Sequence, residues 1–451
     1  MLNAFKLTLC EASRLIRLGK LSPNELLESL LQRINTLEPR LEAWITIDEK
    51  STRDLANELS KKAEKGNFQG PLHGIPIGIK DIYYTAGMRT TAGSKILANF
   101  VPSYDATAVL KLREAGAIIL GKTETTEFAF VDPAPTRNPW NTAHTPGGSS
   151  SGSAAAVSSG MCPAALGTQT TGSTIRPATY CGIVGLKPTY GRISRYGILP
   201  VSWSLDHAGI FTRTVEDAAV LLEVLAGYDP KNPSSSTQPA PRYREALKSC
   251  SVPRLGLLRG FFWDNASSEV KKNIEETVQT LRSAGTEVTE IHSSENFNVA
   301  NAAQRLLMWS EMAAVHEETF RRRMTDYRPS LRSAVAAGLL VPASAYLKAQ
   351  RIRARFTTEM AYALTGFDCF MTPATTTSAP KGLESTGDPA FNGPWSFCGF
   401  PSMTVPSGVT DNGLPLGIQL VGRPFEEELL LKAASWCEKA IRFQHEPHEP
   451  E

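Results

Sequence analysis

The sequence predicts an α/β protein built on a large mixed, mostly parallel β-sheet, with helices on both faces and a helical N-terminal segment. Two observations support this class. From Gly70 onward, short apolar runs alternate with amphipathic helical patterns, as in 105–120 and again in 268–291. Such alternation is typical of a parallel or mixed sheet covered by helices. The chain of 451 residues, 41% hydrophobic and 20% charged, is also long enough for a large core.

Composition argues against several classes of function. The formal net charge is +2 and no basic block is present, so nothing points to nucleic acid or to an anionic membrane. The N-terminus lacks the pattern of a signal peptide, and no run of about 18 apolar residues predicts a membrane span. The seven cysteines are scattered without a Cys-x-x-Cys pair. We therefore expect a reduced, cytoplasmic protein that has no metal site and no cofactor.

Residues 1–65 are predicted to be helical. Ser22 to Glu25 form a capping box with proline at the first helical position. Apolar residues then follow at helical spacing. They are Leu26, Leu27, Leu30, Leu31, Ile34 and Leu37.

Residues 66–441 are predicted to form a single α/β domain. Its segment 229–243, "DPKNPSSSTQPAPRY", reads as a surface linker between two halves of one sheet. Residues 298–402 begin as helices and end in a long Pro/Gly/Thr-rich loop, and we expect them to cover a pocket. The Pro/Glu-rich end, 442–451, is predicted to be disordered.

Two short motifs are misleading. Gly116 to Thr123 matches the G-x-x-x-x-G-K-[ST] pattern of a phosphate loop, but its four middle residues, Ala-Ile-Ile-Leu, read as a strand rather than a loop. Gly148 to Gly152 matches G-x-S-x-G, the nucleophile elbow of α/β-hydrolases, yet no apolar strand precedes it. We therefore expect neither ATP binding nor a Ser-His-Asp hydrolase.

Three segments belong together, and they resemble the amidase signature family. They are "HGIPIGIKDIYYTAGMRTTAGS" (73–94), "TPGGSSSGSAAAVSSG" (145–160) and "LGTQTTGSTIRPATYCGIVGLKPTYGRIS" (166–194). The resemblance continues through 204–222 and 413–434 and is weakest over 230–370. It implies the amidase signature fold and an amidohydrolase with a Ser–Ser–Lys triad.

The resemblance also implies a role for each motif residue. Ser173 matches the nucleophile, Lys80 the final base, and Ser149 the bridging serine, which in the family follows a cis peptide bond. Ser150 is expected to support Ser149 by hydrogen bonding. Ser151 stands where the family more often has glycine, and no catalytic role is expected for it.

The chemistry is reasonable without the family. A serine hydroxyl is a weak nucleophile that needs an adjacent base. Lysine can be that base only when it is neutral, and burial favours the neutral form by lowering the pKa. The apolar approach "GIPIGI" before Lys80 predicts such burial. A serine between the two can relay the proton from Ser173 to Lys80.

Thr170, Thr171, Gly172 and Ser173 are expected to supply backbone N–H groups to an oxyanion hole, as the resemblance implies. The sequence departs here from the commoner Thr-Gly-Gly-Ser, because Thr171 replaces a glycine. A β-branched residue would be strained if this position required a positive φ. Since subgroups of the family accept other residues at this position, we expect the oxyanion hole to form nevertheless, and Thr171 to narrow the pocket instead.

Two further departures bear on the substrate. Arg176 lies three residues after the nucleophile, an order that resembles malonamidase-type members, in which the matching arginine holds a substrate carboxylate. The alternative is a structural pair between Arg176 and an acidic residue. The stretch 125–140 is shorter than in the glutaminase subunits of tRNA amidotransferases, which favours a free-standing hydrolase, monomeric or homodimeric.

The expected pocket lining is rich in apolar and aromatic residues. The candidates are Leu306, Leu307, Met308, Trp309, Phe391, Trp395, Phe397 and Phe400. Trp395 and Phe397 are the substrate contacts singled out, since an aromatic residue in a loop is often functional. This favours a broad hydrolase of small aryl amides, esters or carbamates. Three alternatives stay open: a narrow hydrolase of a carboxylate-bearing amide, one component of an amidotransferase, and an inactive binding module.

Overall fold

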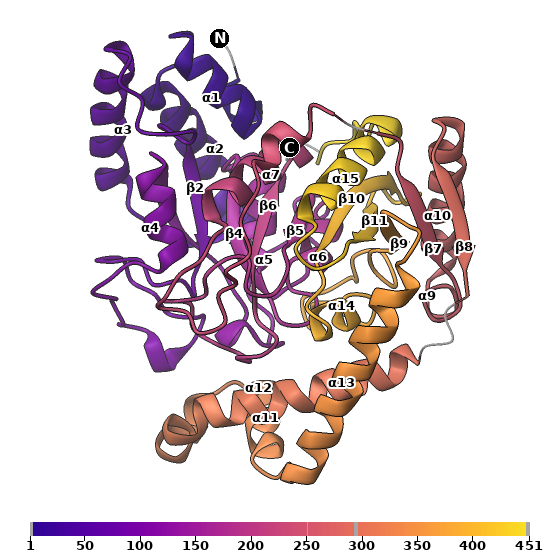
Figure 1. The fold of residues 1–451 in the computed structure, drawn as a ribbon. Helices are drawn as coiled ribbons and strands as arrows, with labels where there is room; N and C mark the ends of the chain where they lie inside the picture. Colours follow the sequence, from indigo (N-terminus) through magenta and orange to yellow (C-terminus); the bar gives the residue numbers. More distant parts are fainter. Residues whose placement is uncertain (1–2, 250, 293–295, 448–451) are drawn as a thin grey trace.

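The computed structural model describes residues 3–249, 251–292 and 296–447, and within them one 11-stranded sheet runs through the molecule (Figure 1). The strand order is β1-β3-β2-β4-β6-β5-β10-β11-β9-β7-β8. The strands are β1 (Trp44–Ile47), β2 (Pro76–Lys80), β3 (Ile118–Thr123), β4 (Ala164–Gln169), β5 (Val184–Lys187), β6 (His207–Thr212), β7 (Arg254–Leu258), β8 (Glu287–Ile291), β9 (Cys369–Pro373), β10 (Ser402–Val409) and β11 (Pro415–Val421).

Helices follow most of the strands along the chain. They are α1 (Leu9–Arg17), α2 (Pro23–Leu41), α3 (Glu49–Glu64), α4 (Thr107–Glu114), α5 (Ser151–Ser158), α6 (Ile175–Tyr180), α7 (Val215–Leu225), α8 (Tyr243–Ala246), α9 (Phe261–Asp264), α10 (Ser268–Ser283), α11 (Phe297–Arg323), α12 (Pro329–Gly338), α13 (Ala343–Ala363), α14 (Gly393–Phe397) and α15 (Glu427–Ile441).

The large mixed sheet is confirmed, but the expectation that it is mostly parallel is wrong. Four of the ten strand pairings among the described residues are parallel, and they join β2 to β3 and β4, and β7 to β8 and β9. The helices α4 and α10 make the crossovers there, as the strand–helix pattern predicted. The central strands pair antiparallel, for example β10 with β11 across a tight turn. Alternation of strands and helices predicts parallel pairing only for the strands that a helix connects. Antiparallel neighbours need no helix between them, because a hairpin needs only a short connection.

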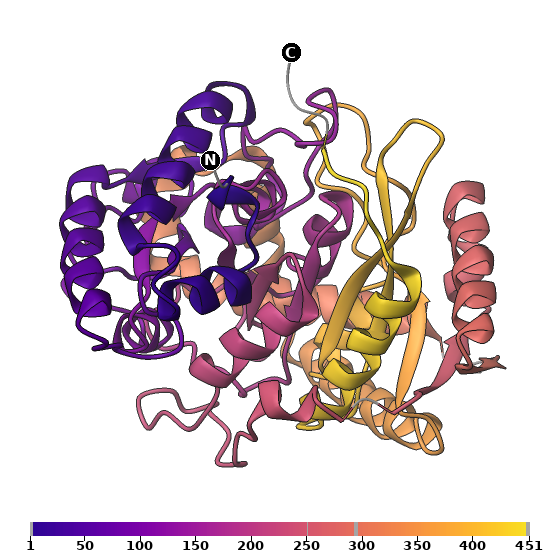
Figure 2. The same ribbon diagram turned by 90° about the horizontal axis from the view of Figure 1, so that it is seen from above.

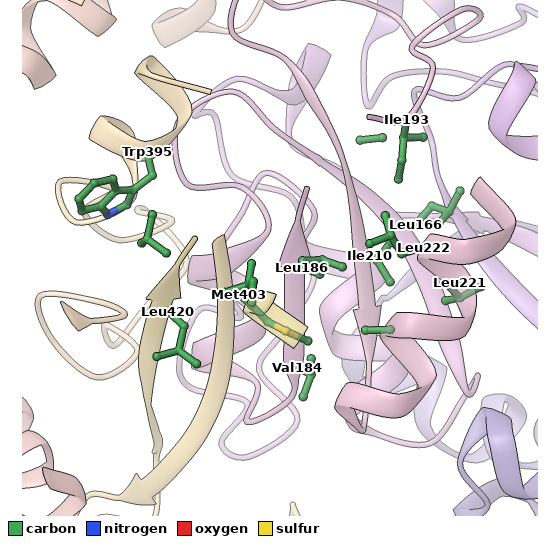
Figure 3. Close-up of a cluster of buried hydrophobic side chains, with 14 of the residues drawn as sticks. Leu166, Val184, Leu186, Ile193, Ile210, Leu221, Leu222, Trp395, Met403 and Leu420 are labelled. Carbon is green, nitrogen blue, oxygen red and sulfur yellow. The ribbon is translucent and has the colours of Figure 1, made fainter. Parts of the chain in front are cut away.

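Helices cover both faces of the sheet, and strand periodicity explains why. Along β3, Ile118 and Leu120 lie in a core cluster with α2, α3, α5 and α6, whereas Ile119 lies in the larger cluster with α1, α4, α7 and α15. Successive side chains of a strand point to opposite faces, so a strand buried on both faces reads as a continuous apolar run. Figure 3 shows part of the larger cluster, with β4, β5 and β6 facing Leu221 and Leu222 of α7.

The N-terminal segment is helical as predicted, and it also contributes a strand. The capping box is present, since the Ser22 side chain accepts from the Glu25 N–H at 3.1 Å and the Ser22 N–H donates to the Glu25 carboxylate at 2.7 Å. After α2, β1 pairs antiparallel with β3 and forms one edge of the sheet. Seen from above (Figure 2), this edge lies far from β8 and α10.

The predicted linker is hydrogen-bonded to the rest of the domain. Between α7 and α8, residues 226–242 contain no helix or strand, yet the Asp229 carboxylate accepts from the Thr107 hydroxyl at 2.6 Å. Helices α11, α12 and α13 form a lobe that extends from one side of the body (Figure 1). Residues 442–447 continue without a helix or strand, and the rest of the predicted disordered tail, 448–451, lies outside the described residues.

The described helices bear on the expectation that no segment spans a membrane. No single helix among them is both long and apolar enough to cross a bilayer. The pair α12 and α13 reaches that length and composition only together, across a bend of 100°.

Candidate active site

Lys80 is the last residue of β2 and is fully buried. Its Nζ donates to the Ser149 Oγ at 2.7 Å and to the Thr168 Oγ1 at 2.9 Å. Thr168 reaches this position because β4 runs parallel beside β2. Adjacent strands of one sheet therefore hold the lysine against the threonine, and Ser149 reaches the lysine from the turn before α5.

Burial determines the charge of this lysine. Removal of Lys80 from water lowers its pKa well below 10.5, and the carboxylate of Asp206 opposes the shift. Desolvation disfavours the ammonium form, so a buried lysine becomes available as a base near neutral pH. In that form the Nζ lone pair can accept the proton of Ser149.

Ser149 follows a cis peptide bond from Gly148, as the family resemblance implied. Its side chain is buried, with 1% exposed. The carbonyl oxygen of Gly148 accepts a hydrogen bond from the Arg176 Nη2 at 2.7 Å. A residue of the next motif thus holds the backbone that presents Ser149.

The two following serines hold the backbone around this site. The Ser150 Oγ donates to the Thr168 carbonyl at 3.3 Å and accepts from the Thr168 N–H at 3.2 Å. It thereby positions the threonine that contacts Lys80. The Ser151 Oγ donates to the Gly147 carbonyl at 2.7 Å at the start of α5. The Ser/Gly-rich stretch is therefore an ordered turn into a helix.

Ser173 lies in the turn between β4 and α6 and is 9% exposed. The Oε1 of Gln169 accepts from the N–H groups of Thr174 and Ile175 at 2.9 and 3.0 Å, which fixes the turn after Ser173. Residues Thr170 to Ser173 line a cavity of about 820 Å³ between the sheet and the α11–α12 lobe. Ser173 is therefore accessible to a small molecule.

The backbone beside Ser173 has free donors. The N–H groups of Thr171, Gly172 and Ser173 donate no hydrogen bond to any residue that the structure describes. Consecutive free N–H groups at a cavity can stabilise a developing oxyanion. Thr171 has no positive φ, so the threonine is accommodated without the strain considered from the sequence. Its Oγ1 contacts the Met308 Sδ at 3.5 Å, on the side of the cavity that α11 lines.

Arg176 borders the same cavity and is 4% exposed. Besides Gly148, its guanidinium donates to the Gly387 carbonyl at 2.9 Å and to the Thr386 hydroxyl at 3.0 Å. Among the described residues it forms no ion pair, so the expected structural pair with an acidic residue is not found. Burial lowers the pKa of Arg176, opposed by Tyr180 and Asp388, and its buried Nε has no hydrogen-bond partner.

Two predicted substrate contacts lie elsewhere. Trp395 and Phe397 belong to the short helix α14, are fully buried and do not line the cavity. The Trp395 ring stacks on Phe262 at 6.1 Å between centroids, inside the aromatic core (Figure 3 places it beside the sheet). Composition could not separate a pocket from a core, because both are rich in aromatic residues. Of the eight candidates, Met308 and Trp309 line the cavity.

The cavity lining is more polar than the sequence suggested. Four charged residues contribute, namely Arg176, Arg305, Glu384 and Asp388. The amide side chains come from α11, which supplies Asn298, Asn301 and Gln304. A polar, hydrogen-bonding substrate suits such a lining.

Several contacts at the site were missed from the sequence. Thr168 touches Lys80, Asp206 accepts from the Thr170 hydroxyl at 2.6 Å, and Gln304 donates to the Thr170 carbonyl at 3.1 Å. The available signal for Gln304 was a polar residue that, together with Arg305, interrupts the apolar run "AAQRLLMW". The signal for Thr168 was its place next to the end of a buried strand.

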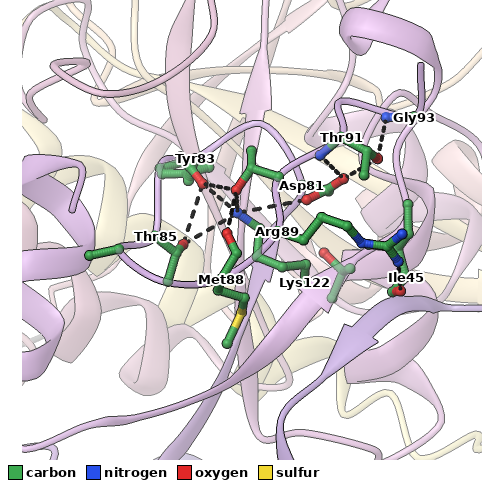
Figure 4. A network of polar contacts seen from close by, with 12 residues as sticks. Ile45, Asp81, Tyr83, Thr85, Met88, Arg89, Thr91, Gly93 and Lys122 are labelled. Atoms are coloured by element: carbon green, nitrogen blue, oxygen red, sulfur yellow. Dashed lines mark hydrogen bonds and ion pairs between the residues drawn. The ribbon is translucent and has the colours of Figure 1, made fainter. Parts of the chain in front are cut away.

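The phosphate-loop match is part of the sheet, as the sequence argument predicted. Gly121, Lys122 and Thr123 are strand residues of β3. The buried Lys122 side chain donates to the Tyr83 carbonyl and to the Thr90 hydroxyl, and pairs with Asp81 at 3.7 Å (Figure 4). Burial lowers the pKa of Lys122 to about 8. Lys122 therefore belongs to a buried structural network, and it is not the lysine of a phosphate-binding loop.

Comparison with known proteins agrees with the geometry. The family model Amidase matches residues 25–431. A curated relative, the A subunit of the glutamyl-tRNA(Gln) amidotransferase from Geobacter metallireducens, is 37% identical over 98% of this chain and 99% of its own length.

Solved structures extend this likeness. The native peptide amidase from Stenotrophomonas maltophilia has a TM-score of 0.85 and 32% identity, with 98% of each chain covered. A structure described as a vestigial complex that reveals the origins of an s-triazine catabolic enzyme has a TM-score of 0.90 and 30% identity, over 96% of this chain and 98% of that one. Because the family model spans most of the sequence and these relatives align with nearly all of it, the chain belongs to the amidase family, whose members hydrolyse amide bonds.

Proposed function

We propose that the chain hydrolyses the C–N bond of a small-molecule amide through an acyl-enzyme on Ser173. The observation that carries the proposal is the hydrogen bond between the buried Lys80 and Ser149 at 2.7 Å. It joins a lysine of lowered pKa to a serine in the motif that precedes the nucleophile. Lys80 is the base, Ser149 the relay and Ser173 the nucleophile.

The reaction runs in two halves. The Ser173 Oγ attacks the amide carbonyl carbon, its proton passes to Ser149, and the Ser149 proton passes to Lys80. The N–H groups of Thr171, Gly172 and Ser173 stabilise the oxyanion. Collapse breaks the C–N bond, and the amine leaves with the proton that Lys80 returns through Ser149. Water then attacks the ester by the same relay and releases the acid.

The preferred substrate is an amide that also carries a carboxylate. Arg176 is buried at the cavity that contains Ser173 and forms no ion pair with a described acidic residue, although the Asp388 carboxylate interacts with it electrostatically. A buried charge is costly unless it is paired, so an anionic group of the substrate would compensate it. The alternative is the broad hydrolysis of aryl amides, esters and carbamates. It keeps support from the apolar side chains that do line the cavity, Phe130 and Trp309.

A second candidate function comes from the curated relatives. Because they are subunits of glutamyl-tRNA(Gln) amidotransferases, this chain is alternatively one component of such an enzyme, with glutamine as its amide substrate and partner chains required for activity. The short stretch 125–140 favours a free-standing enzyme instead. Glutamine is itself a carboxylate-bearing amide, so the two candidates can be tested together.

A single substrate panel tests these proposals. Turnover would be measured at neutral pH with Ser173→Ala as the blank. The panel would pair acidic half-amides and glutamine with neutral acyl anilides and aryl carbamates. We expect faster turnover of acidic half-amides than of anilides. Activity on the neutral substrates alone would overturn the role of Arg176. Glutamine hydrolysis only after addition of amidotransferase partner chains would favour the amidotransferase component.

A further inference from the structure

Three peptide carbonyls beside Ser173 accept hydrogen bonds, two of them from side chains of helices that are distant in the sequence. The Thr170 carbonyl accepts from the Gln304 Nε2 at 3.1 Å, and the Thr171 carbonyl accepts from the Ser396 Oγ at 3.0 Å. The Gly172 carbonyl accepts from the Arg176 N–H at 3.1 Å. Gln304 belongs to α11 and Ser396 to α14. Hydrogen bonds from two separate helices therefore fix the backbone before Ser173.

Peptide geometry gives these contacts a consequence. In a trans peptide the C=O and N–H groups are coplanar and point in opposite directions. A donor that fixes the Thr170 carbonyl on the side of α11 therefore also fixes the direction of the Thr171 N–H. That N–H is one of the three free donors beside Ser173.

Gln304 is well placed for this task. Its side chain is buried, with 2% exposed, and the same Nε2 also donates to the Thr171 hydroxyl at 2.9 Å. The two acceptors flank a single peptide group. The amide thus fixes both the carbonyl of that peptide and the side chain of the residue that carries its N–H.

We propose that Gln304 is a positioning residue that orients the Thr170–Thr171 peptide so that its N–H faces the oxyanion. The inference rests on the proposed function, since it assumes that Ser173 is the nucleophile. The inference adds that the oxyanion hole is formed only while α11 packs against the Thr170–Thr171 peptide. Because α11 also lines the cavity through Asn301 and Arg305, substrate contacts on that helix bear on the same peptide.

Two variants test the proposal. Gln304→Met keeps the size of the side chain and removes the donor, and Gln304→Leu removes the donor with a second apolar side chain of different shape. Loss of one oxyanion donor typically lowers kcat about 100- to 1,000-fold, and a misoriented donor is expected to lower it at least about tenfold. KM should change less than about threefold, since the effect is confined to the transition state.

The matched control is Gln350→Met, the same change on α13, where the Gln350 Nε2 donates to the Tyr346 hydroxyl at 3.0 Å. It should leave both kinetic constants unchanged. Thermal unfolding of all variants would show that the Gln304 proteins are folded. Ser396→Ala removes the donor to the Thr171 carbonyl and so frees the Thr171–Gly172 peptide. It should lower kcat in the same way, which gives an independent test of peptide orientation.

Labelling of Ser173 by a fluorophosphonate separates the two proposals. Slower labelling of the Gln304 variants, in step with kcat, would support the inference. Equal labelling and equal kcat in wild type and both Gln304 variants would overturn it, as would a rise in KM at constant kcat. A wild-type protein whose Ser173 is not labelled would overturn the proposed function and this inference with it.

Discussion

The Nζ of Lys80 and the Oγ of Ser149 lie 2.7 Å apart inside the protein, where neither side chain is more than 1% exposed. Water therefore cannot take the place of either partner. In water the lysine would hold its proton, and in this environment its pKa is lowered well below 10.5. One contact thus combines a base with the hydroxyl that connects it to the nucleophile.

Lys80→Met and Ser149→Ala should both abolish efficient turnover. Each removes one step of the proton relay, and general acid–base catalysis contributes about 10²- to 10⁴-fold. The double variant should lose little more than either single one, because the two residues act as a unit. Steady-state kinetics on the best substrate of the panel checks this. Multiplicative losses in the double variant would show that the two residues act independently.

The activity should rise with pH through an acidic limb set by Lys80. The base is active when neutral, so activity appears as pH rises above its pKa. Because burial lowers that pKa, the limb should lie well below pH 10.5. The rate of fluorophosphonate labelling of Ser173, followed from acidic to alkaline pH, measures it, with Lys80→Met as the control that should lack the limb. Labelling that is still increasing near pH 10.5 would contradict a buried neutral lysine.

Arg176→Gln should discriminate between substrates. Loss of a hydrogen bond to a charged group costs about 1.5–3 kcal/mol, so kcat/KM for an acidic half-amide should fall about 10- to 100-fold more than for a neutral amide. Part of the loss is common to all substrates, because Arg176 also holds the Gly148 carbonyl. Arg305→Gln is the matched control, since this less buried arginine should matter less. Equal losses on both substrates would assign Arg176 a purely structural role.

Much of the fold could be predicted from local sequence. The capping box at Ser22 and the strand–helix order around β3 and around α10 were informative because caps and apolar periodicity act within a few residues. The antiparallel centre could not be predicted, since strand order depends on contacts between distant segments. Strand β1 was missed because Trp44 to Ile47 is too short to show alternation.

The site was predicted unevenly for a similar reason. The residues that the family resemblance singled out, Lys80 and Ser149, are in contact, and Ser173 lies at the cavity. The lining was predicted from aromatic composition and proved wrong for Trp395, because composition does not tell which face of a helix meets the cavity. Gln304 could not be found either, since its partners lie 134 and 133 residues away in the sequence.

The buried pair of Lys122 and Asp81 should be essential for stability next to the site. The two side chains are fully buried, 3.7 Å apart, in the network of Figure 4. Lys122→Met should lower the free energy of unfolding by about 3–5 kcal/mol, because it leaves the Asp81 carboxylate buried without its cation. Urea denaturation at neutral pH measures the loss.

The double variant Asp81→Asn/Lys122→Met tests the cause of that loss. It removes the uncompensated charge and should recover part of the stability. The penalty in Lys122→Met should also shrink as pH falls. Burial already raises the pKa of Asp81, and Lys122 opposes that rise. Without Lys122 the folded protein binds a proton at Asp81 more readily than the unfolded chain does, so its stability is greater at low pH and is lost as pH rises. A penalty below about 1 kcal/mol at neutral pH, or one that does not depend on pH, would mean that the hydrogen bonds of Asp81 to Thr91 alone satisfy the carboxylate.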